Sequence, residues 1–118
     1  MRYMLLIYME ENALTESERE ECYGKSAELA REINETGQFL ATAPLQPTST
    51  ATSVKVRDGR RFVTDGPFAE TREQLGGYFL INAIDLDEAI GIAERIPGAR
   101  VGTVEIRPVI EVADLPEE

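Results

Sequence analysis

The 118-residue sequence predicts an α+β domain in which two helices cover one face of a mostly antiparallel sheet. Short segments of alternating or continuous apolar residues, bounded by Gly, Pro and Asp, are typical of strands. Two other segments carry apolar residues at helical spacing, and each follows a pattern that caps a helix. Together these observations predict the element order β-α-β-β-β-β-α-β.

The chain begins with a strand over residues 2–8, where apolar residues run almost continuously. After a polar loop, Thr15 and Glu18 match a capping box, which predicts a helix that extends to residue 36. Four residues at spacings of four, three and three mark the apolar face expected for this helix: Tyr23, Ala27, Ala30 and Ile33. Gly37 is suited to the position just after the helix.

A second strand is expected over residues 39–43. Pro44 and Pro47 follow it, which restricts it to a sheet edge or gives it an irregular exit. Residues 47–53 then form a polar loop. It is too short to link two domains.

Asp58-Gly59 predicts the turn of a β-hairpin. A two-residue turn would pair Val56 with Arg61, which mixes polar and apolar residues on each face. We therefore expect one extra loop residue or a bulge that places Val56 opposite Phe62. The second hairpin strand is expected over residues 60–64.

A fifth strand is predicted over residues 77–82, and Asp85 with Glu88 matches a second capping box. The helix that follows carries the stripe Leu86, Ala89, Ile90 and Ala93. Pro97-Gly98 stops it, and residues 101–109 form the last strand. The plan is ferredoxin-like, with the β-hairpin inserted into a split βαβ arrangement. The sheet face without helices still carries apolar residues, so we expect a symmetric homodimer to cover it.

The whole chain, 1–118, fits one domain, with residues 113–118 as a loose acidic tail. No apolar run reaches the roughly 18–20 residues of a membrane span, and the N-terminus lacks a cleavage signature. We therefore expect a cytoplasmic protein without membrane contact.

The formal net charge is −10, which repels nucleic acid, so no direct nucleic-acid binding is expected. One basic cluster interrupts this pattern: Lys55, Arg57, Arg60 and Arg61. It is either a solvated hairpin tip or a patch that docks an anion or a protein partner.

The sequence has no histidine and a single cysteine, Cys22. This composition argues against a zinc site built from His and Cys, and excludes Ser-His-Asp catalysis and an intrachain disulfide. No P-loop or GxGxxG pattern occurs, so no metal or cofactor is expected. Cys22 is expected to be a packing residue, because no histidine is present to activate it.

The segment 63–78 concentrates the candidate chemistry. Asp65 precedes Gly66-Pro67, which favour a sharp turn, and Phe68 is expected to anchor that turn in the core. Asp65 either hydrogen-bonds its own turn or stands at a cleft rim, where partial burial would raise its pKa toward that of a useful general acid or base. Glu70 is a candidate second carboxylate paired with Asp65. Arg72 either pairs with one of these two carboxylates or binds an anionic substrate, unless Glu70 and Arg72 are simply solvated.

Two further residues are candidates for substrate binding. Arg107 lies in the last strand between apolar neighbours and needs a partner or an exposed face. It either forms an edge or interface salt bridge or faces the same cleft as Asp65. Tyr78 either packs in the core or offers its phenol to that cleft.

The sequence resembles the YCII-related family in its DGPF-domain branch, at Asp65-Gly66-Pro67-Phe68 and, after Glu70 and Glu73, at Leu75-Gly76-Gly77-Tyr78. The resemblance extends over nearly the whole chain. It implies a ferredoxin-like fold of the dimeric α/β-barrel type, assembled as dimers. Members of this branch are often encoded beside extracytoplasmic-function sigma factors. A related branch uses a His–Asp pair, of which only the aspartate carries over, onto Asp65.

Three functional hypotheses follow. The first is a small cofactor-free enzyme of the lyase or isomerase type, in which Asp65 moves a proton in a dimer-associated cleft and Arg107 or Arg72 holds a small polar or anionic substrate. The alternative is a non-catalytic binding or regulatory module linked to extracytoplasmic-function sigma factor signalling, whose acidic first helix binds a protein partner. The third is a dimer that binds a metabolite without chemistry.

Overall fold

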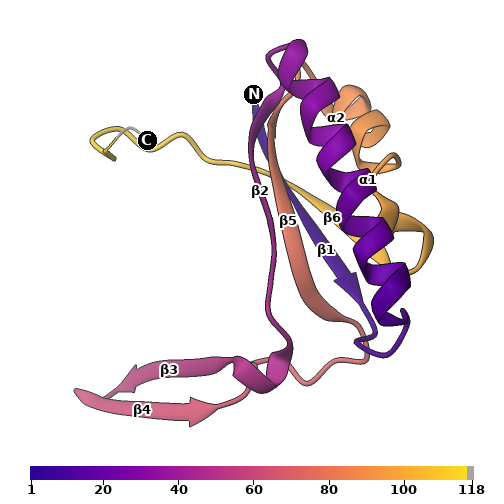
Figure 1. The fold of residues 1–118 in the computed structure, drawn as a ribbon. Coiled ribbons are helices and arrows are strands. Elements are labelled where there is room, and N and C mark those ends of the chain that lie inside the picture. Colours follow the sequence, from indigo (N-terminus) through magenta and orange to yellow (C-terminus); the bar gives the residue numbers. More distant parts are fainter. Residues whose placement is uncertain (117–118) are drawn as a thin grey trace.

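The computed structural model describes residues 1–116 and confirms the α+β class, with two helices and antiparallel sheets (Figure 1). The elements are β1 (Arg2–Met9), α1 (Glu16–Glu35), β2 (Phe39–Pro44), the 3₁₀ turn η1 (Thr48–Thr50), β3 (Thr52–Arg57), β4 (Arg60–Asp65), β5 (Gln74–Asn82), α2 (Leu86–Ala93), the 3₁₀ turn η2 (Pro97–Arg100) and β6 (Thr103–Pro108). Compared with the sequence prediction, β5 begins three residues earlier and β6 is shorter at both ends.

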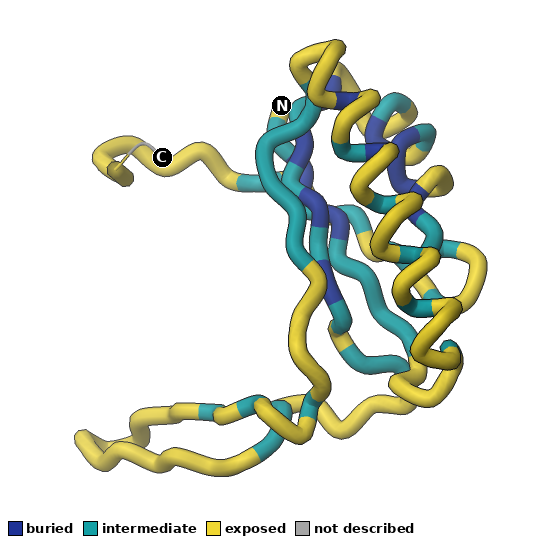
Figure 2. Tube along the Cα trace, viewed as in Figure 1, coloured by how far each residue is buried: buried dark blue, intermediate teal, exposed yellow. Residues whose placement is uncertain are grey.

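Four strands form the main sheet in the order β2-β5-β1-β6, and every neighbouring pair is antiparallel. This order is consistent with a ferredoxin-like fold once the β3–β4 hairpin is set aside as an insertion. Both helices lie on one face of the sheet (Figure 1). The core lies between these layers, and its largest fully buried side chains are Leu5, Ile33, Phe79, Ile81 and Ile96 (Figure 2).

Helix α1 begins with the predicted capping box, in which Thr15 and Glu18 each accept a hydrogen bond from the other's backbone N–H. Its buried residues are Leu29 and Ile33, whereas Tyr23 is exposed. The predicted face was therefore right at Ile33 and at the half-buried Ala30, and wrong at Tyr23 and Ala27, because the N-terminal half of α1 extends past the core.

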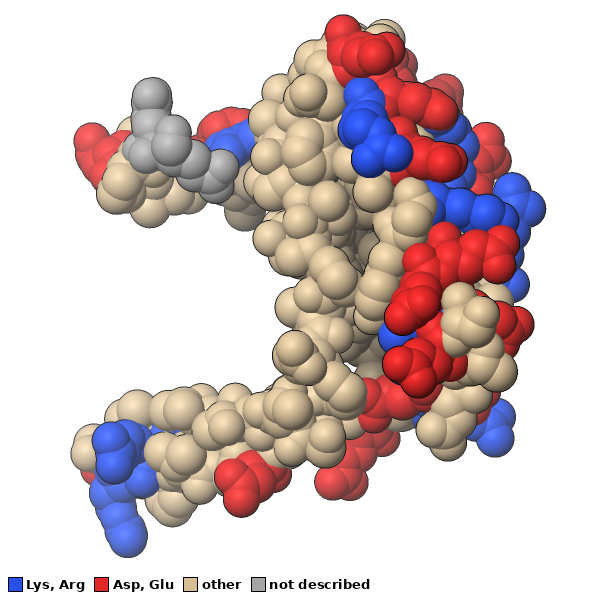
Figure 3. Space-filling view, viewed as in Figure 1, with Lys and Arg blue, Asp and Glu red and all other residues tan. Residues whose placement is uncertain are grey.

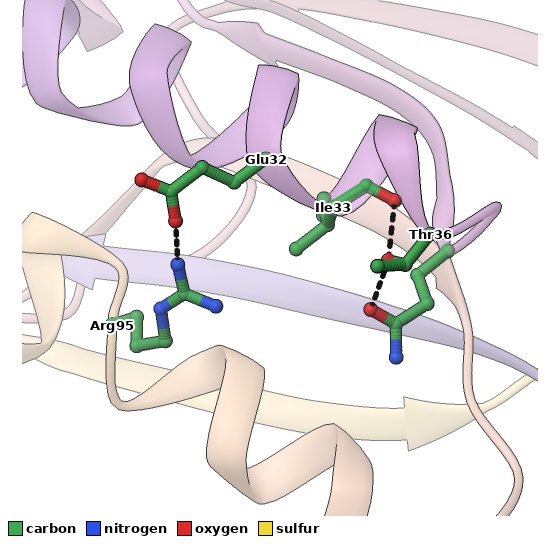
Figure 4. Close-up of polar contacts among 5 residues, drawn as sticks. Glu32, Ile33, Thr36 and Arg95 are labelled. Atoms are coloured by element: carbon green, nitrogen blue, oxygen red, sulfur yellow. Dashed lines mark hydrogen bonds and ion pairs between the residues drawn. The ribbon is translucent and has the colours of Figure 1, made fainter.

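The end of α1 is tied to its neighbours by polar contacts (Figure 4). The Thr36 hydroxyl lies 3.0 Å from the Ile33 carbonyl oxygen and 2.7 Å from Gln38 Oε1. Glu32 forms an ion pair with Arg95, just beyond α2. The Thr36 contacts therefore order the end of α1, and the ion pair links α1 to the segment that follows α2.

Helix α2 forms only half of the predicted capping box. The Asp85 side chain accepts a hydrogen bond from the Glu88 N–H at 2.9 Å. The Glu88 carboxylate instead accepts hydrogen bonds from the Ile84 N–H at 3.1 Å and Gln38 Nε2 at 2.9 Å. The predicted stripe is right at Ala89 and Ala93, which are buried, and wrong at its other two members, Leu86 and Ile90, which are exposed while Ile92 is buried.

The β3–β4 hairpin has the tight register, so the predicted bulge was wrong. Val56 pairs with Arg61, and the two turn residues, Asp58 and Gly59, have φ values of 52° and 73°. Positive φ at both central positions suits the two-residue turn that Asp-Gly favours. Neither hairpin face is buried, with Val54 64% exposed, so burial does not select a register and the turn chemistry decides it.

Two segments project from the sheet on the side away from the helices (Figures 1 and 2). We call the hairpin residues 52–65 the arm and residues 109–116 the tail. The Cα radius of gyration is 16.0 Å, compared with roughly 13.5 Å for a compact domain of this length. The described chain is therefore more extended than its core requires. Neither helix of residues 1–116 has the length and apolar character needed to cross a membrane.

Candidate functional site

Asp65 ends β4 at the base of the arm, opposite Thr52, and it is exposed. The next residue, Gly66, has a φ of 104°, which glycine tolerates and other residues avoid. Its N–H donates to the Ala51 carbonyl at 2.8 Å, and its carbonyl accepts from the Ser53 hydroxyl at 2.8 Å. Asp65-Gly66 is therefore part of a turn, held by hydrogen bonds, that joins the two ends of the arm at its base.

Phe68 does not anchor this turn in the core, because its side chain is 91% exposed. The prediction was wrong because the turn stands at the arm, away from the layer between sheet and helices. Glu70 is exposed, and Arg72 forms an ion pair with Glu10 at 3.1 Å rather than with Asp65.

Tyr78 and Arg107 lie on the open face of the main sheet. Tyr78 is paired with Leu6 and Arg107 with Met4, and these β1 residues alternate with the buried Leu5 that faces the helices. The Arg107 guanidinium pairs with Glu105 on the same strand, with Nε 3.2 Å from Oε2.

The five predicted site residues therefore occupy three places within one chain: the arm base, the connection after it, and the open sheet face. The fold brings Tyr78 and Arg107 to the same face. It does not place Asp65 beside them, because Arg107 lies near the start of β1 and the arm begins near the end of β1.

A cavity of about 750 Å³ lies between the first turns of α1 and the base of the arm. Four segments line it: the loop after β1, α1, the connection from β2 to η1, and the start of β5. Its volume is within the range of small-molecule sites. None of the five predicted residues is among those that line it.

Glu11 ties two walls of this cavity together. One carboxylate oxygen accepts the Thr48 backbone N–H at 2.8 Å, and the other accepts the Thr48 hydroxyl. The hydroxyl hydrogen bond is the main cause of the lowered pKa of Glu11, followed by the backbone hydrogen bond. The guanidinium of Arg19 donates to the Glu11 carbonyl at 3.3 Å, so the same loop also holds α1.

The lining combines one cation, Arg19, and one carboxylate, Glu11, with neutral polar and apolar groups. Arg19, Cys22 and Tyr23 come from one face of α1, as residues three and four positions apart do. The amides of Gln46 and Gln74 add donors and acceptors, and the apolar lining residues are Met9, Leu14, Pro44, Leu45, Pro47 and Leu75. Such a lining suits a small molecule with an anionic or polar group and an apolar body.

A shallower cavity of about 470 Å³ lies near Gln38 and Glu88. These two side chains already hydrogen-bond to each other. Within residues 1–116, no group of three or more His, Cys, Asp or Glu side chains is arranged to hold a metal ion.

Sequence reasoning missed Arg19 and Glu11. A signal for Arg19 was present, because it lies four residues before Tyr23 on the same helix face. Tyr23 had been placed in the core, however, so its neighbours were not considered as a site. Nothing local marks Glu11, since its partner Thr48 is distant in sequence.

Comparison with known proteins extends these observations to relatives. The YCII-related domain matches residues 1–113. An uncharacterized protein of Rhizobium meliloti (strain 1021) is 36% identical over 114 residues, which cover 92% of each chain. Since both similarities span nearly the whole chain, this protein belongs to the YCII-related family.

Proposed function

We propose that this protein binds a small polar or anionic molecule in the cavity beside the arm, with Arg19 as the group that recognises the anion. The observation that carries the proposal is the number of hydrogen-bond donors that this guanidinium has left over. It has five N–H donors, and the hydrogen bond described for it uses one, on the Glu11 carbonyl. A planar cation with donors left over in a cavity of ligand size is suited to a carboxylate or a phosphate.

The Glu11 carboxylate does not occupy the hydrogen-bond donors of Arg19 that a ligand anion would use. Both of its carboxylate oxygens already accept hydrogen bonds from Thr48, and its contact with Arg19 runs through the backbone carbonyl. The carboxylate still lies close enough for Arg19 to lower the pKa of Glu11. A ligand anion would therefore approach Arg19 from the side of the cavity away from Glu11.

A thermal-shift screen with small carboxylates and phosphates tests this proposal. A ligand that binds the folded state raises Tm, because it increases the free energy of unfolding. At a ligand concentration one hundred times Kd, this increase is about 2.7 kcal/mol. Arg19→Ala should weaken binding about 10–100-fold, as expected for a lost charge-assisted hydrogen bond. The matched control is Arg31→Ala, an exposed arginine on α1 that does not line the cavity. Equal binding by Arg19→Ala and the control would contradict the proposal.

We further propose that the protein is a homodimer joined through the open sheet face. Met4, Leu6 and Leu80 lie on this face together with the Arg107–Glu105 ion pair. Figure 3 shows a hollow between the arm and the tail whose visible surface is mainly uncharged. Apolar residues on the arm, and Phe68 at its base, are also exposed. Exposed apolar side chains that are grouped on one surface are typical of protein–protein interfaces. Leu6→Asp should convert a dimer to a monomer in sedimentation analysis, and a wild-type monomer at all concentrations would contradict the dimer.

Catalysis is a finer proposal that depends on this dimer. Asp65 would act as general acid or base in a lyase or isomerase reaction, in the cleft between one copy's arm and its partner's sheet, with Tyr78 and Arg107 as substrate ligands. The fixed turn after Asp65 and the arm's projection on the open side support it. Once a ligand is found, Asp65→Asn should retain binding and abolish turnover. Unchanged turnover would exclude Asp65 as the proton-transfer group.

The regulatory alternative would use the acidic outer surface of α1, where Glu16, Glu20 and Glu21 are exposed. A basic protein partner, as in a sigma-factor circuit, would bind there. Reversal of these three charges to lysine should then abolish partner recovery in a pull-down. Recovery that does not change would exclude α1 as the docking surface.

A further inference from the structure

We propose that, in the dimer, the tail of each copy lies along the arm of its partner. This inference rests on the proposed homodimer and adds its symmetry: the twofold axis runs across the strands rather than along them. The two sheets then face each other with opposite ends together. Each arm–tail contact buries apolar side chains and pairs a basic segment with an acidic one.

The arm and the tail leave the open face at opposite ends of β1. At one end, Met9 pairs with Gln74, beside the base of the arm. At the other end, the Val109 N–H donates to the Arg2 carbonyl at 2.9 Å where the tail begins. Figure 1 shows both segments projecting to the same side, so the chain forms a C-shaped outline that a second sheet can enter.

An ion pair sets the direction in which the tail departs. Arg2 at the start of β1 donates to both carboxylate oxygens of Glu111, from Nε at 3.1 Å and from Nη2 at 2.9 Å. A bidentate arginine–carboxylate contact fixes geometry as well as distance. It ties the first residues of the tail to the start of β1 and so fixes where the tail leaves the sheet.

Only two simple symmetries place the open faces together. A twofold axis parallel to the strands brings equal ends together, so arm would lie beside arm and tail beside tail. An axis perpendicular to the strands brings opposite ends together, so each arm would lie beside the partner's tail. In both cases the interface is self-complementary, as a twofold axis requires.

The charges of the two segments favour the perpendicular axis. The arm carries four basic and two acidic residues between positions 52 and 65, and the basic side chains gather at its tip (Figure 3). The tail carries two acidic residues, Glu111 and Asp114, and no basic one, and the sequence continues with Glu117 and Glu118. Arm beside arm would oppose like charges, which interfaces avoid, whereas arm beside tail pairs opposite charges.

Apolar surface and length agree with this pairing. The arm exposes Val54, Val56 and Val63, and the tail exposes Ile110, which is 82% accessible, and Val112. Both hairpin strands are free edges within the described residues. The six-residue strands of the arm span roughly 20 Å. The tail has a turn at residues 113–114, and once this turn opens its eight residues can span up to roughly 26 Å. The tail is therefore long enough to cover the arm.

Disulfide trapping in the full-length chain discriminates the two symmetries. In a Cys22→Ser background, Val56→Cys is placed on the arm and Val112→Cys on the tail. Mild oxidation of an equimolar mixture should give covalent dimers containing one of each variant, and Val56→Cys alone should give several-fold less dimer. More efficient crosslinking of Val56→Cys alone would place arm beside arm and overturn the proposal.

A charge-swap experiment provides an equilibrium readout. Reversal of Arg57, Arg60 and Arg61 to glutamate should weaken the dimer at least 10-fold in sedimentation equilibrium, as should reversal of Asp114, Glu117 and Glu118 to lysine. Both sets together in one chain should restore Kd to within about threefold of wild type. Reversal of Glu16, Glu20 and Glu21 on α1 is the matched control and should have no effect.

The outcomes separate this inference from the proposed function. If the wild-type protein is a dimer and the tail reversal does not change its Kd, the proposed arm–tail contact is wrong and the proposed dimer stands. A dimer weakened by the arm and α1 reversals, but not by the tail reversal, overturns it as well and places the arm on the partner's helix. Ligand binding by Arg19 is measured independently of both.

Discussion

A single added methyl group at Gly102 should destabilise the fold strongly. Gly102 lies just before β6, where this segment passes β1. A Cβ built on Gly102 would stand 2.0 Å from the Tyr8 carbonyl oxygen and 2.8 Å from Met9 Cβ. Carbon–oxygen contacts in proteins are normally about 3.3–3.6 Å, so the backbone must separate by more than about 1 Å. The atom in the way belongs to the backbone of a central strand and cannot turn aside.

The expected cost of Gly102→Ala is about 3 kcal/mol, near the upper end of the range for overpacked sites. For a domain of this size, each kcal/mol lowers Tm by roughly 4 °C. Tm should therefore fall by roughly 12 °C. Thermal and urea unfolding followed by circular dichroism measure this loss, and the urea m-value should not change.

Gly24→Ala is the matched control, with an effect of opposite sign. Gly24 lies inside α1, and a Cβ there meets no heavy atom within 4 Å. Replacing a helical glycine with alanine should stabilise the protein by about 0.5–1 kcal/mol. If Gly102→Ala melts within 2 °C of wild type, or no lower than Gly24→Ala, the close approach of β6 to β1 is refuted.

Three further predictions concern polar contacts. Removing the capping hydroxyl in Thr15→Ala should cost about 1 kcal/mol in urea unfolding, and no loss would contradict the capping box. The pKa of Glu11 is lowered in the folded state, so its contribution is present above the unfolded pKa of about 4.3 and is lost as pH falls through the folded pKa. Glu11→Gln should therefore lose less stability than wild type between pH 6 and pH 3, whereas parallel pH curves would exclude this linkage. Arg2→Ala should release Glu111 and speed hydrogen exchange at the Val109 amide, and unchanged exchange would show that the ion pair does not hold the tail.

The sequence predicted best where one local signal and one burial pattern agree. Thr15 with Glu18 and Gly37 placed both ends of α1 within a residue or so, because caps depend on nearby residues. The register of the arm was mispredicted because we assumed a buried face. In the structure neither face is buried, and the Asp58-Gly59 turn alone sets the pairing.

The candidate site was predicted less well, because it depends on contacts between distant segments. The segment Asp65-Gly66-Pro67-Phe68 does form a turn held by hydrogen bonds. That turn lies at the base of the arm, however, and leaves Phe68 exposed. The cavity appears only when the loop after β1 meets η1 through Glu11 and Thr48, 37 residues apart. No spacing rule predicts such a contact, whereas Arg19 could have been found from its helical spacing to Tyr23.

Titration of a small carboxylate or phosphate that raises Tm, followed by ¹H–¹⁵N NMR, shows directly whether the ligand binds beside Arg19. If it does, the amide signals that shift should belong to Arg19, Cys22 and Gln74, and Arg19→Ala should abolish these shifts. Shifts that cluster instead at Asp65, Tyr78 and Arg107 would contradict binding beside Arg19 and place the ligand in the cleft between two copies.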